Sequence, residues 1–292
     1  MQNAYLLPVY TDKEDFKLFT EKKIKTHSFE INYAEAGQGE TLLLVHGMSN
    51  NWTGWIPLAK ILKDYFRVVL IDLPGYGKSQ RLEKYSVEIQ AQALEEFISK
   101  LDLKVTSIVG LSMGSIVIAE FLSNYADKVD SAVLCGPMFH LRNAEWASWI
   151  SNKGLWAVDK TKGASTVLKR LITNTLASYV ITKYVNMHRF DRELVDAYGL
   201  SGRRLMDPKA FVQMGMSVTT NIVEDDLKDC SVPVQFIFGS EDKITSPASA
   251  KKKMQNAKGD FKFAEIANAG HIVTLEKPMQ VAEIIIEFLR NI

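Results

Sequence analysis

The sequence of 292 residues predicts an α/β fold, in which a mostly parallel central sheet is covered by helices on both faces. Short runs of aliphatic and β-branched residues recur along the chain, and segments with helical spacing follow them. This alternation is typical of parallel sheets. Most of the runs are almost entirely apolar, as expected of strands buried on both faces.

The predicted parallel strands lie at residues 41–45, 67–71, 105–109, 131–135, 234–238 and 261–266. Residues 24–36 are typical of an antiparallel hairpin or a pair of edge strands that precede the parallel part. The segment 86–101 is predicted to be an amphipathic helix, because its apolar residues recur at helical spacing. The last helix, 278–290, begins at Pro278, a favourable residue for the first turn of a helix.

A long segment interrupts the alternation between the strands 131–135 and 234–238. Residues 137–230 are predicted to be mostly helical and are rich in Trp, Tyr, Met and Leu. Glycine and proline do not cluster into a linker on either side, so an independent unit is not expected. The sequence therefore predicts a core domain made of 1–136 and 231–292, with a helical lid inserted at 137–230.

The composition excludes several classes of function. Hydrophobic residues at 47% and charged residues at 24% lie in the ordinary globular range. A net charge of +1 provides no field for binding nucleic acid or anionic lipid by charge alone. We expect a neutral small-molecule substrate and a chain that is a monomer or a homodimer. No secretion signal and no run of eighteen apolar residues is visible, so we expect a cytoplasmic protein without a membrane span.

The two cysteines are not expected to pair. Cys135 lies at the exit end of one predicted strand, whereas Cys230 lies just before the entry of the next. Parallel strands place these two positions at opposite edges of the sheet, too far apart for a disulfide. We expect two reduced thiols.

The strongest motif is a glycine-flanked serine at the end of a predicted strand. Ser112 lies between Gly110 and Gly114, and a predicted helix follows directly. In this strand-to-turn-to-helix setting the G-x-S-x-G pattern indicates a nucleophilic serine on a strained turn. Taken alone, the pattern would equally fit an ordinary turn.

Two further residues follow parallel strands at the same edge of the sheet. Asp242 comes after the strand 234–238, and His271 comes after the strand 261–266. The order serine, acid, histidine is the one in which this kind of triad occurs on a parallel sheet. We therefore expect His271 to remove the proton of Ser112, while Asp242 fixes the tautomer of the imidazole and stabilises its charged form.

With these residues the chain resembles the α/β-hydrolase superfamily, the lipase, esterase and C–C-bond hydrolase group, over residues 24–292. His46-Gly47-Met48 resembles the oxyanion loop of that family, and the segment 72–79 resembles its D-x-P-G-x-G-x-S turn. The resemblance implies an α/β-hydrolase fold. It also implies an oxyanion hole formed by the backbone N–H groups of Met48 and Met113.

Other polar motifs have simpler interpretations. The side chain of His46 is expected to be structural and to bond the loop backbone. Gly77-Lys78-Ser79 is not a phosphate-binding loop, because Asp72 stands where that motif requires glycine. His27, His140 and His188 are expected to be surface or packing residues. The histidines do not cluster with cysteine or acidic residues at metal-ligand spacing, so neither a metal nor a cofactor is expected.

An apolar roof over Ser112 is expected from aromatic residues of the insertion and of the oxyanion loop. The residues predicted to line the substrate pocket are Trp52, Phe139, Trp146 and Ile272. Such a lining predicts a substrate of small to medium size with a sizeable apolar part.

The leading hypothesis is a carboxylic ester hydrolase that acts through an acyl-enzyme on Ser112. A C–C-bond hydrolase or an acyltransferase would use the same triad, and Arg142 and Arg192 are candidates for binding a substrate carboxylate in the former. A perhydrolase side activity is also open, as is a signalling receptor that retains the triad. The resemblance disfavours epoxide hydrolases and haloalkane dehalogenases, which carry aspartate where this chain has Ser112.

Overall fold

The computed structural model describes residues 13–102, 104–139, 145–172 and 174–292, without the side chains of 13, 145–152, 172, 185 and 186. Its centre is an eight-stranded sheet with the strand order β1-β2-β4-β3-β5-β6-β7-β8. The pairs β1–β2 and β2–β4 are antiparallel, and all the other neighbouring strands are parallel. The predicted α/β class with a mostly parallel sheet is therefore confirmed.

The strands lie close to their predicted positions. Their bounds are β1 Thr20–Lys25, β2 Glu30–Ala36, β3 Thr41–Val45, β4 Arg67–Ile71, β5 Val105–Leu111, β6 Val129–Cys135, β7 Val234–Gly239 and β8 Phe261–Ile266. The expected antiparallel hairpin is present but begins at Thr20, earlier than the predicted segment 24–36. Its second strand, β2, also pairs with β4 and is not an edge strand.

Helices cover both faces of the sheet. In and around the core they are η1 Lys13–Leu18, η2 Trp52–Trp55, α1 Ile56–Leu62, α2 Val87–Lys100, α3 Met113–Tyr125, η3 Ala126–Lys128, α11 Pro247–Met254, α12 Val273–Glu276 and α13 Pro278–Arg290. Alternate residues of a strand point to opposite faces. Leu43 and Val45 of β3 accordingly pack with α2 and α3, whereas Leu42 and Leu44 pack with α1 and α13.

The amphipathic pattern of α2 shows how the sequence fixes one of these layers. The hydroxyl of Ser86 caps the helix by accepting a hydrogen bond from the N–H of Ile89 at 3.3 Å. Leu94, Phe97 and Ile98 form its buried side. Burial of this apolar stripe, more than helix propensity, holds α2 against the sheet.

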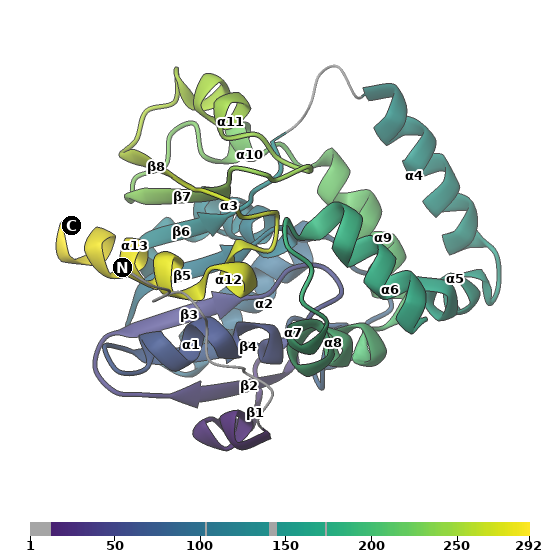
Figure 1. Cartoon of the computed structure of the whole chain (residues 1–292), viewed down its shortest axis with the longest axis horizontal. Helices are drawn as coiled ribbons and strands as arrows, with labels where there is room; N and C mark the ends of the chain where they lie inside the picture. The colour runs from purple at the N-terminus through teal and green to yellow at the C-terminus, as the bar shows by residue number, and fades with distance from the viewer. Residues whose placement is uncertain (1–12, 103, 140–144, 173) are drawn as a thin grey trace, which may run out of the picture.

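The chain between β6 and β7 forms further helices, most of which lie on the right in Figure 1. They are α4 Glu145–Lys160, α5 Ala164–Ile172, α6 Thr175–Ile181, α7 Arg192–Leu194, α8 Leu200–Leu205, α9 Pro208–Thr220 and α10 Val223–Asp226, with the π-helical turns η5 Thr182–Asn186 and η6 Val195–Gly199. Among the described residues of 137–230 no strand is present, in agreement with the predicted helical content.

The two cysteines are both free and buried. Burial raises the pKa of the Cys135 thiol to about 12, which makes it an inert packing residue. Across the ranges described above, no helix has the length and apolarity that crossing a membrane requires.

Candidate active site

Ser112 lies at the turn between β5 and α3 and has an unusual backbone conformation. Its φ of 53° and ψ of −116° lie outside the regions that L-residues ordinarily adopt. The N–H of Ser112 donates to the carbonyl of Cys135 at 2.8 Å, which ties this turn to the end of β6. The strain presents the hydroxyl above the carboxyl edge of the sheet.

The two flanking glycines are required by close approaches of the backbone. A Cβ at Gly110 would lie 2.7 Å from the backbone nitrogen of Ser115. A Cβ at Gly114 would lie only 2.2 Å from the carbonyl oxygen of Val45 at the end of β3. The sequence pattern therefore permits α3 to begin immediately after β5 and against the neighbouring strand.

The structure brings Ser112, His271 and Asp242 together from three different loops. The Nε2 atom of His271 lies 2.8 Å from the Oγ of Ser112, and its Nδ1 lies 2.9 Å from Oδ2 of Asp242. The side chains of His271 and Asp242 are only 5% and 1% exposed. This geometry can transfer the serine proton to the imidazole while the carboxylate stabilises the charge that develops.

The surroundings of the Asp242 carboxylate favour its ionised form. Burial alone would raise its pKa, but the hydrogen bond and charge of His271 and the hydroxyl of Thr245 hold the pKa below its usual value. Oδ1 also accepts hydrogen bonds from the N–H groups of Ile244 and Thr245, at 2.7 and 3.0 Å. These donors fix the carboxylate against His271.

Gly136 gives the imidazole the space that it occupies. It follows β6 with a φ of +54°, a conformation that favours glycine. A Cβ at this position would lie 3.2 Å from both Cε1 and Nδ1 of His271. A larger residue would therefore push the imidazole away from Ser112 or Asp242.

Met48 and Met113, whose backbone N–H groups are predicted to form the oxyanion hole, lie at the same cavity as Ser112. Both residues line the cavity beside the serine, and Met113 is the first residue of α3. Within the ranges that the structure describes, neither N–H donates to a protein acceptor. The start of α3 adds the positive end of its dipole, so an oxyanion at this position would be stabilised.

His46 holds the loop that carries Met48. Its buried ring places Nδ1 2.8 Å from the carbonyl oxygen of Gly47, and Nε2 accepts a hydrogen bond from the N–H of Leu73 at 3.1 Å. This arrangement requires a neutral imidazole with the proton on Nδ1. Burial lowers the pKa of His46 to about 4.

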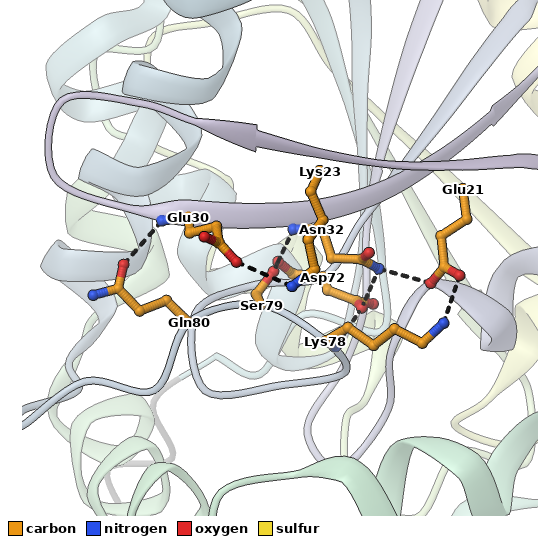
Figure 2. A network of polar contacts seen from close by, with 8 residues as sticks. All are labelled: Glu21, Lys23, Glu30, Asn32, Asp72, Lys78, Ser79 and Gln80. Carbon is orange, nitrogen blue, oxygen red and sulfur yellow. Dashed lines mark hydrogen bonds and ion pairs between the residues drawn. The ribbon is translucent and has the colours of Figure 1, made fainter.

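Asp72 is the centre of a polar network behind the same loop, drawn in Figure 2. Its carboxylate accepts hydrogen bonds from the N–H of Trp52 at 2.8 Å, the amide of Asn32 at 2.8 Å and the N–H of Lys78 at 2.9 Å. A Cβ at Gly77 would lie 1.9 Å from one of its oxygens. The segment 72–79 thus has a structural role, because Asp72 binds the chain that follows β3 through the N–H of Trp52.

Glu276 on α12 joins the histidine loop to the helical insertion. Oε1 accepts a hydrogen bond from the N–H of Gly270 at 2.8 Å, next to His271. Oε2 accepts from the N–H groups of His188 and Arg189 in the insertion, at 2.9 and 3.1 Å. Burial raises the pKa of Glu276, and these donors oppose the rise.

A cavity of about 300 Å³ opens beside Ser112 and His271. Its wall combines the loop after β3 and the end of β5 with residues of the insertion and is largely apolar. The lining includes Met138, Ile181, Phe211, Val218, Ile244 and Ile272. One cationic side chain, that of Arg203, also lines it.

The residues predicted for the pocket have different positions. Ile272 lines the cavity. Trp52 does not: its ring packs against Phe16 and Phe19, with centroid distances of 6.0 Å, and its Nε1 donates to Glu21. The prediction was wrong because the ring belongs to the core cluster that includes residues of α1, and not to the residues that line the cavity.

Phe139 does not line the cavity either, and that prediction was also wrong. It packs in the core with Phe236 of β7, at a centroid distance of 5.8 Å, because the chain leaving β6 turns its ring back over the sheet. Trp146 falls outside the described side chains, and His140 and Arg142 lie outside the described residues. Arg192 is paired with Asp196 and Tyr179 and is not part of the cavity lining.

Sequence reasoning missed Arg203, Met138, Ile181 and Ile244. For Ile244 a signal existed, because it follows Asp242 by two residues in the same loop. For Arg203 no local signal separates it from Arg204, which is exposed. Only the packing of α8 decides which of the two faces the cavity.

The chain is similar to known hydrolases in sequence and in structure. Monoacylglycerol lipase ABHD6 of Homo sapiens is 25% identical over 277 residues, which cover 88% of this chain and 77% of the lipase. A thermophilic esterase from Thermogutta terrifontis has a similar structure, with a TM-score of 0.73 and 24% identity over 93% of this chain and 98% of the esterase. A bacterial membrane phospholipase A gives a TM-score of 0.77 and 20% identity, with coverage of 94% and 88%.

These solved structures establish a shared fold and leave the substrate open. A family model adds a more specific relationship, because the model of the alpha/beta hydrolase fold matches residues 40–278. The match includes Ser112, Asp242 and His271 together with the loop after β3. Since it spans most of the chain, this protein belongs to the alpha/beta hydrolase fold family.

Proposed function

We propose that the protein is a serine hydrolase that cleaves carboxylic esters through an acyl-enzyme on Ser112. The observation that carries this proposal is the chain of contacts from Ser112 Oγ to His271 Nε2 and from His271 Nδ1 to Asp242, at 2.8 and 2.9 Å. Proton transfer along such a chain is what makes a serine hydroxyl nucleophilic near neutral pH.

In the proposed reaction Ser112 Oγ attacks the ester carbonyl and gives its proton to His271. The N–H groups of Met48 and Met113 hold the negative charge on the carbonyl oxygen. His271 then protonates the departing alcohol, and a water molecule deprotonated by His271 releases the acid and restores the serine. Asp242 stabilises the imidazolium in both halves of the cycle.

The cavity supports a substrate of small to medium size with an apolar part. A volume of about 300 Å³ lies at the lower end of ligand pockets. The insertion contributes several of the lining residues, which supports its proposed role as a lid over the site. The sequence similarity to monoacylglycerol lipases also supports ester hydrolysis, although it leaves the alcohol open.

The first test is labelling with a fluorophosphonate probe, followed by hydrolysis of p-nitrophenyl esters of increasing chain length. We expect covalent labelling at Ser112 and a loss of turnover of about a thousandfold or more in Ser112→Ala. Ser123→Ala is the matched control, because Ser123 is an exposed serine on the same helix and should leave both readouts unchanged.

Two results would contradict the proposal. Undiminished ester hydrolysis by Ser112→Ala would show that another group is the nucleophile. Labelling of Ser112 without steady-state hydrolysis of any ester in the series would instead favour a receptor or acyltransferase role for the same triad.

A further inference from the structure

Arg203 is the one permanently charged residue among the described residues that line the catalytic cavity. It lies on α8, in the insertion, while the rest of the wall is mostly aliphatic, aromatic or methionine. A guanidinium group remains charged under all ordinary conditions, and placing it against an apolar wall costs free energy unless an anion compensates it.

The described part of the chain does not supply that anion. One guanidinium nitrogen, Nη2, donates to the hydroxyl of Thr182 at 2.8 Å. The other, Nη1, is buried and has no hydrogen-bond partner among the described residues. No described carboxylate forms an ion pair with Arg203, and the burial that lowers its pKa is not offset by any neighbouring acid.

Other arginines of the chain show the contrast. Arg67 is paired with Glu35, and Arg192 is paired with Asp196. Arg204, the next residue along α8, is exposed to solvent. Arg203 is therefore a partly buried arginine at the cavity whose buried Nη1 has no described partner. Neither Arg204 nor the two paired arginines have this combination of properties.

The position of Arg203 is fixed by contacts of α8 with the loop after β3. A Cβ at Gly202 would lie 2.4 Å from the Cα of Asn50, so the glycine lets the helix lie directly on this loop. Ser201 adds a hydrogen bond to Thr53, with 2.7 Å between the two hydroxyl oxygens. Thr182 is only 1% exposed, and its hydroxyl orients the guanidinium by accepting the hydrogen bond from Nη2.

We propose that Arg203 binds a carboxylate of the substrate at a distance from the ester that Ser112 attacks. A carboxylate supplies both the negative charge and the paired acceptors that a guanidinium fork accommodates, whereas a hydroxyl would leave the charge uncompensated. The apolar wall around Ile181 and Phe211 fits a hydrocarbon segment between the two ends. The preferred substrates are half-esters of dicarboxylic acids or similar esters that carry an anionic end. This inference rests on the proposed ester hydrolysis and specifies its substrate class.

The test compares pairs of methyl esters of equal chain length. One member is neutral, such as methyl hexanoate, and the other carries a terminal carboxylate, such as monomethyl adipate; the series runs from succinate to sebacate. Acid release is followed at constant pH. We expect the wild-type protein to prefer one of the half-esters in kcat/KM, and Arg203→Met to reduce the ratio of half-ester to neutral ester by about a hundredfold.

Two variants separate recognition from folding. Arg203→Lys keeps the charge without the planar fork and should recover part of the preference. Arg204→Met changes the exposed neighbour on the same helix and should leave the preference unchanged. Fluorophosphonate labelling of Ser112 in each variant checks that the catalytic site is still assembled.

Binding is measured independently of turnover with Ser112→Ala and monomethyl adipate by calorimetry. The additional change Arg203→Met should weaken this binding by about a hundredfold. A wild-type protein that hydrolyses neutral esters with no gain from a terminal carboxylate would overturn the role of Arg203 and leave the ester hydrolase proposal intact. Absence of ester hydrolysis together with Arg203-dependent binding would overturn the ester hydrolase proposal and leave the carboxylate-binding role of Arg203 intact.

Discussion

At the scale of single residues, His46 shows that the loop after β3 depends on a histidine that does no chemistry. The Nε2 atom of its imidazole accepts a hydrogen bond from the N–H of Leu73, and Nδ1 donates to the carbonyl oxygen of Gly47. The ring thus connects two loops, and this connection requires that Nε2 carry no proton. Protonation would replace that acceptor with a donor opposite another donor. The side chain was expected to be structural, and its contacts agree with that interpretation.

The first prediction concerns the pH dependence of stability. The pKa of His46 is about 4 in the folded protein and near 6.5 when the chain is unfolded. The unfolded state therefore binds the proton first, so the contribution of His46 to the free energy of unfolding is complete above pH 6.5 and falls as the pH decreases toward 4. Between pH 7 and pH 5 this loss amounts to about 2 kcal/mol.

The measurement is urea unfolding at both pH values for three proteins. The side chain in His46→Gln does not titrate, so the loss of unfolding free energy between pH 7 and pH 5 should be smaller than in the wild type by about 2 kcal/mol. His27→Gln changes an exposed histidine of the β1–β2 turn and should lose as much unfolding free energy between pH 7 and pH 5 as the wild type. An equal loss in all three proteins would exclude the proposed protonation of His46.

At the scale of elements, the site depends on how closely α3 follows β5 and approaches β3. The positive φ of Ser112 turns the chain within one residue, and Gly114 lets the first turn of the helix touch the carbonyl of Val45. Met113 and the loop that carries Met48 therefore line the cavity together with Ser112. A small shift of α3 would separate the two proposed oxyanion donors.

The second prediction compares two glycine-to-alanine changes in helices. Gly114→Ala places a methyl group 2.2 Å from the Val45 oxygen and should cost about 2 kcal/mol or more of stability, because backbone must move to relieve the contact. It should also lower kcat at least tenfold. Gly154→Ala in α4 meets no atom within 4 Å and should stabilise the protein by up to about 1 kcal/mol through helix propensity.

Thermal unfolding and ester hydrolysis of both variants check this prediction. A Gly114→Ala protein as stable and active as the wild type would mean that α3 and β3 are not in the close contact described above.

At the scale of the whole molecule, Glu276 connects the helical insertion to the core next to the catalytic histidine. The carboxylate of Glu276 contacts Gly270 in the histidine loop and His188 and Arg189 in the insertion. Movement of the insertion relative to the core would therefore disturb the loop that carries His271. The insertion also supplies Ile181, Arg203 and Phe211 to the cavity, so substrate binding and the position of the insertion are coupled.

The third prediction is that Glu276→Gln loosens this connection. Glutamine has one acceptor oxygen where glutamate has two, and its amide group would face N–H donors. Loss of a hydrogen bond to a buried charged group costs about 1.5–3 kcal/mol of stability. We expect backbone amide exchange at Gly270, His188 and Arg189 to accelerate about tenfold or more, together with a lower kcat. Glu265→Gln, on the exposed side of β8, should change neither. Unaltered exchange at the three amides would show that the connection does not restrain the insertion.

Much of the framework could be predicted from the sequence because it depends on local patterns. Apolar runs of five or six residues predicted strands such as Thr41–Val45 and Arg67–Ile71 at their observed bounds, and the apolar repeat predicted α13. The loops after parallel strands open at the same edge of a sheet, so the glycine-flanked serine and the chain order of Ser112, Asp242 and His271 were enough to predict that all three residues lie at that edge.

The sequence by itself determined the α/β class, the insertion between two strands and the residues that converge at the sheet edge, because strand periodicity and parallel connection fix that edge. Only the tertiary structure decided which side chains face the cavity. Trp52 and Phe139 are aromatic and close to the site in sequence, yet one packs on Phe16 and Phe19 and the other on Phe236. Arg203 and Arg204 are identical neighbours, and the contact of Gly202 with Asn50 sets the position of α8. The direction of a side chain depends on packing between segments far apart in the chain, which no local pattern records.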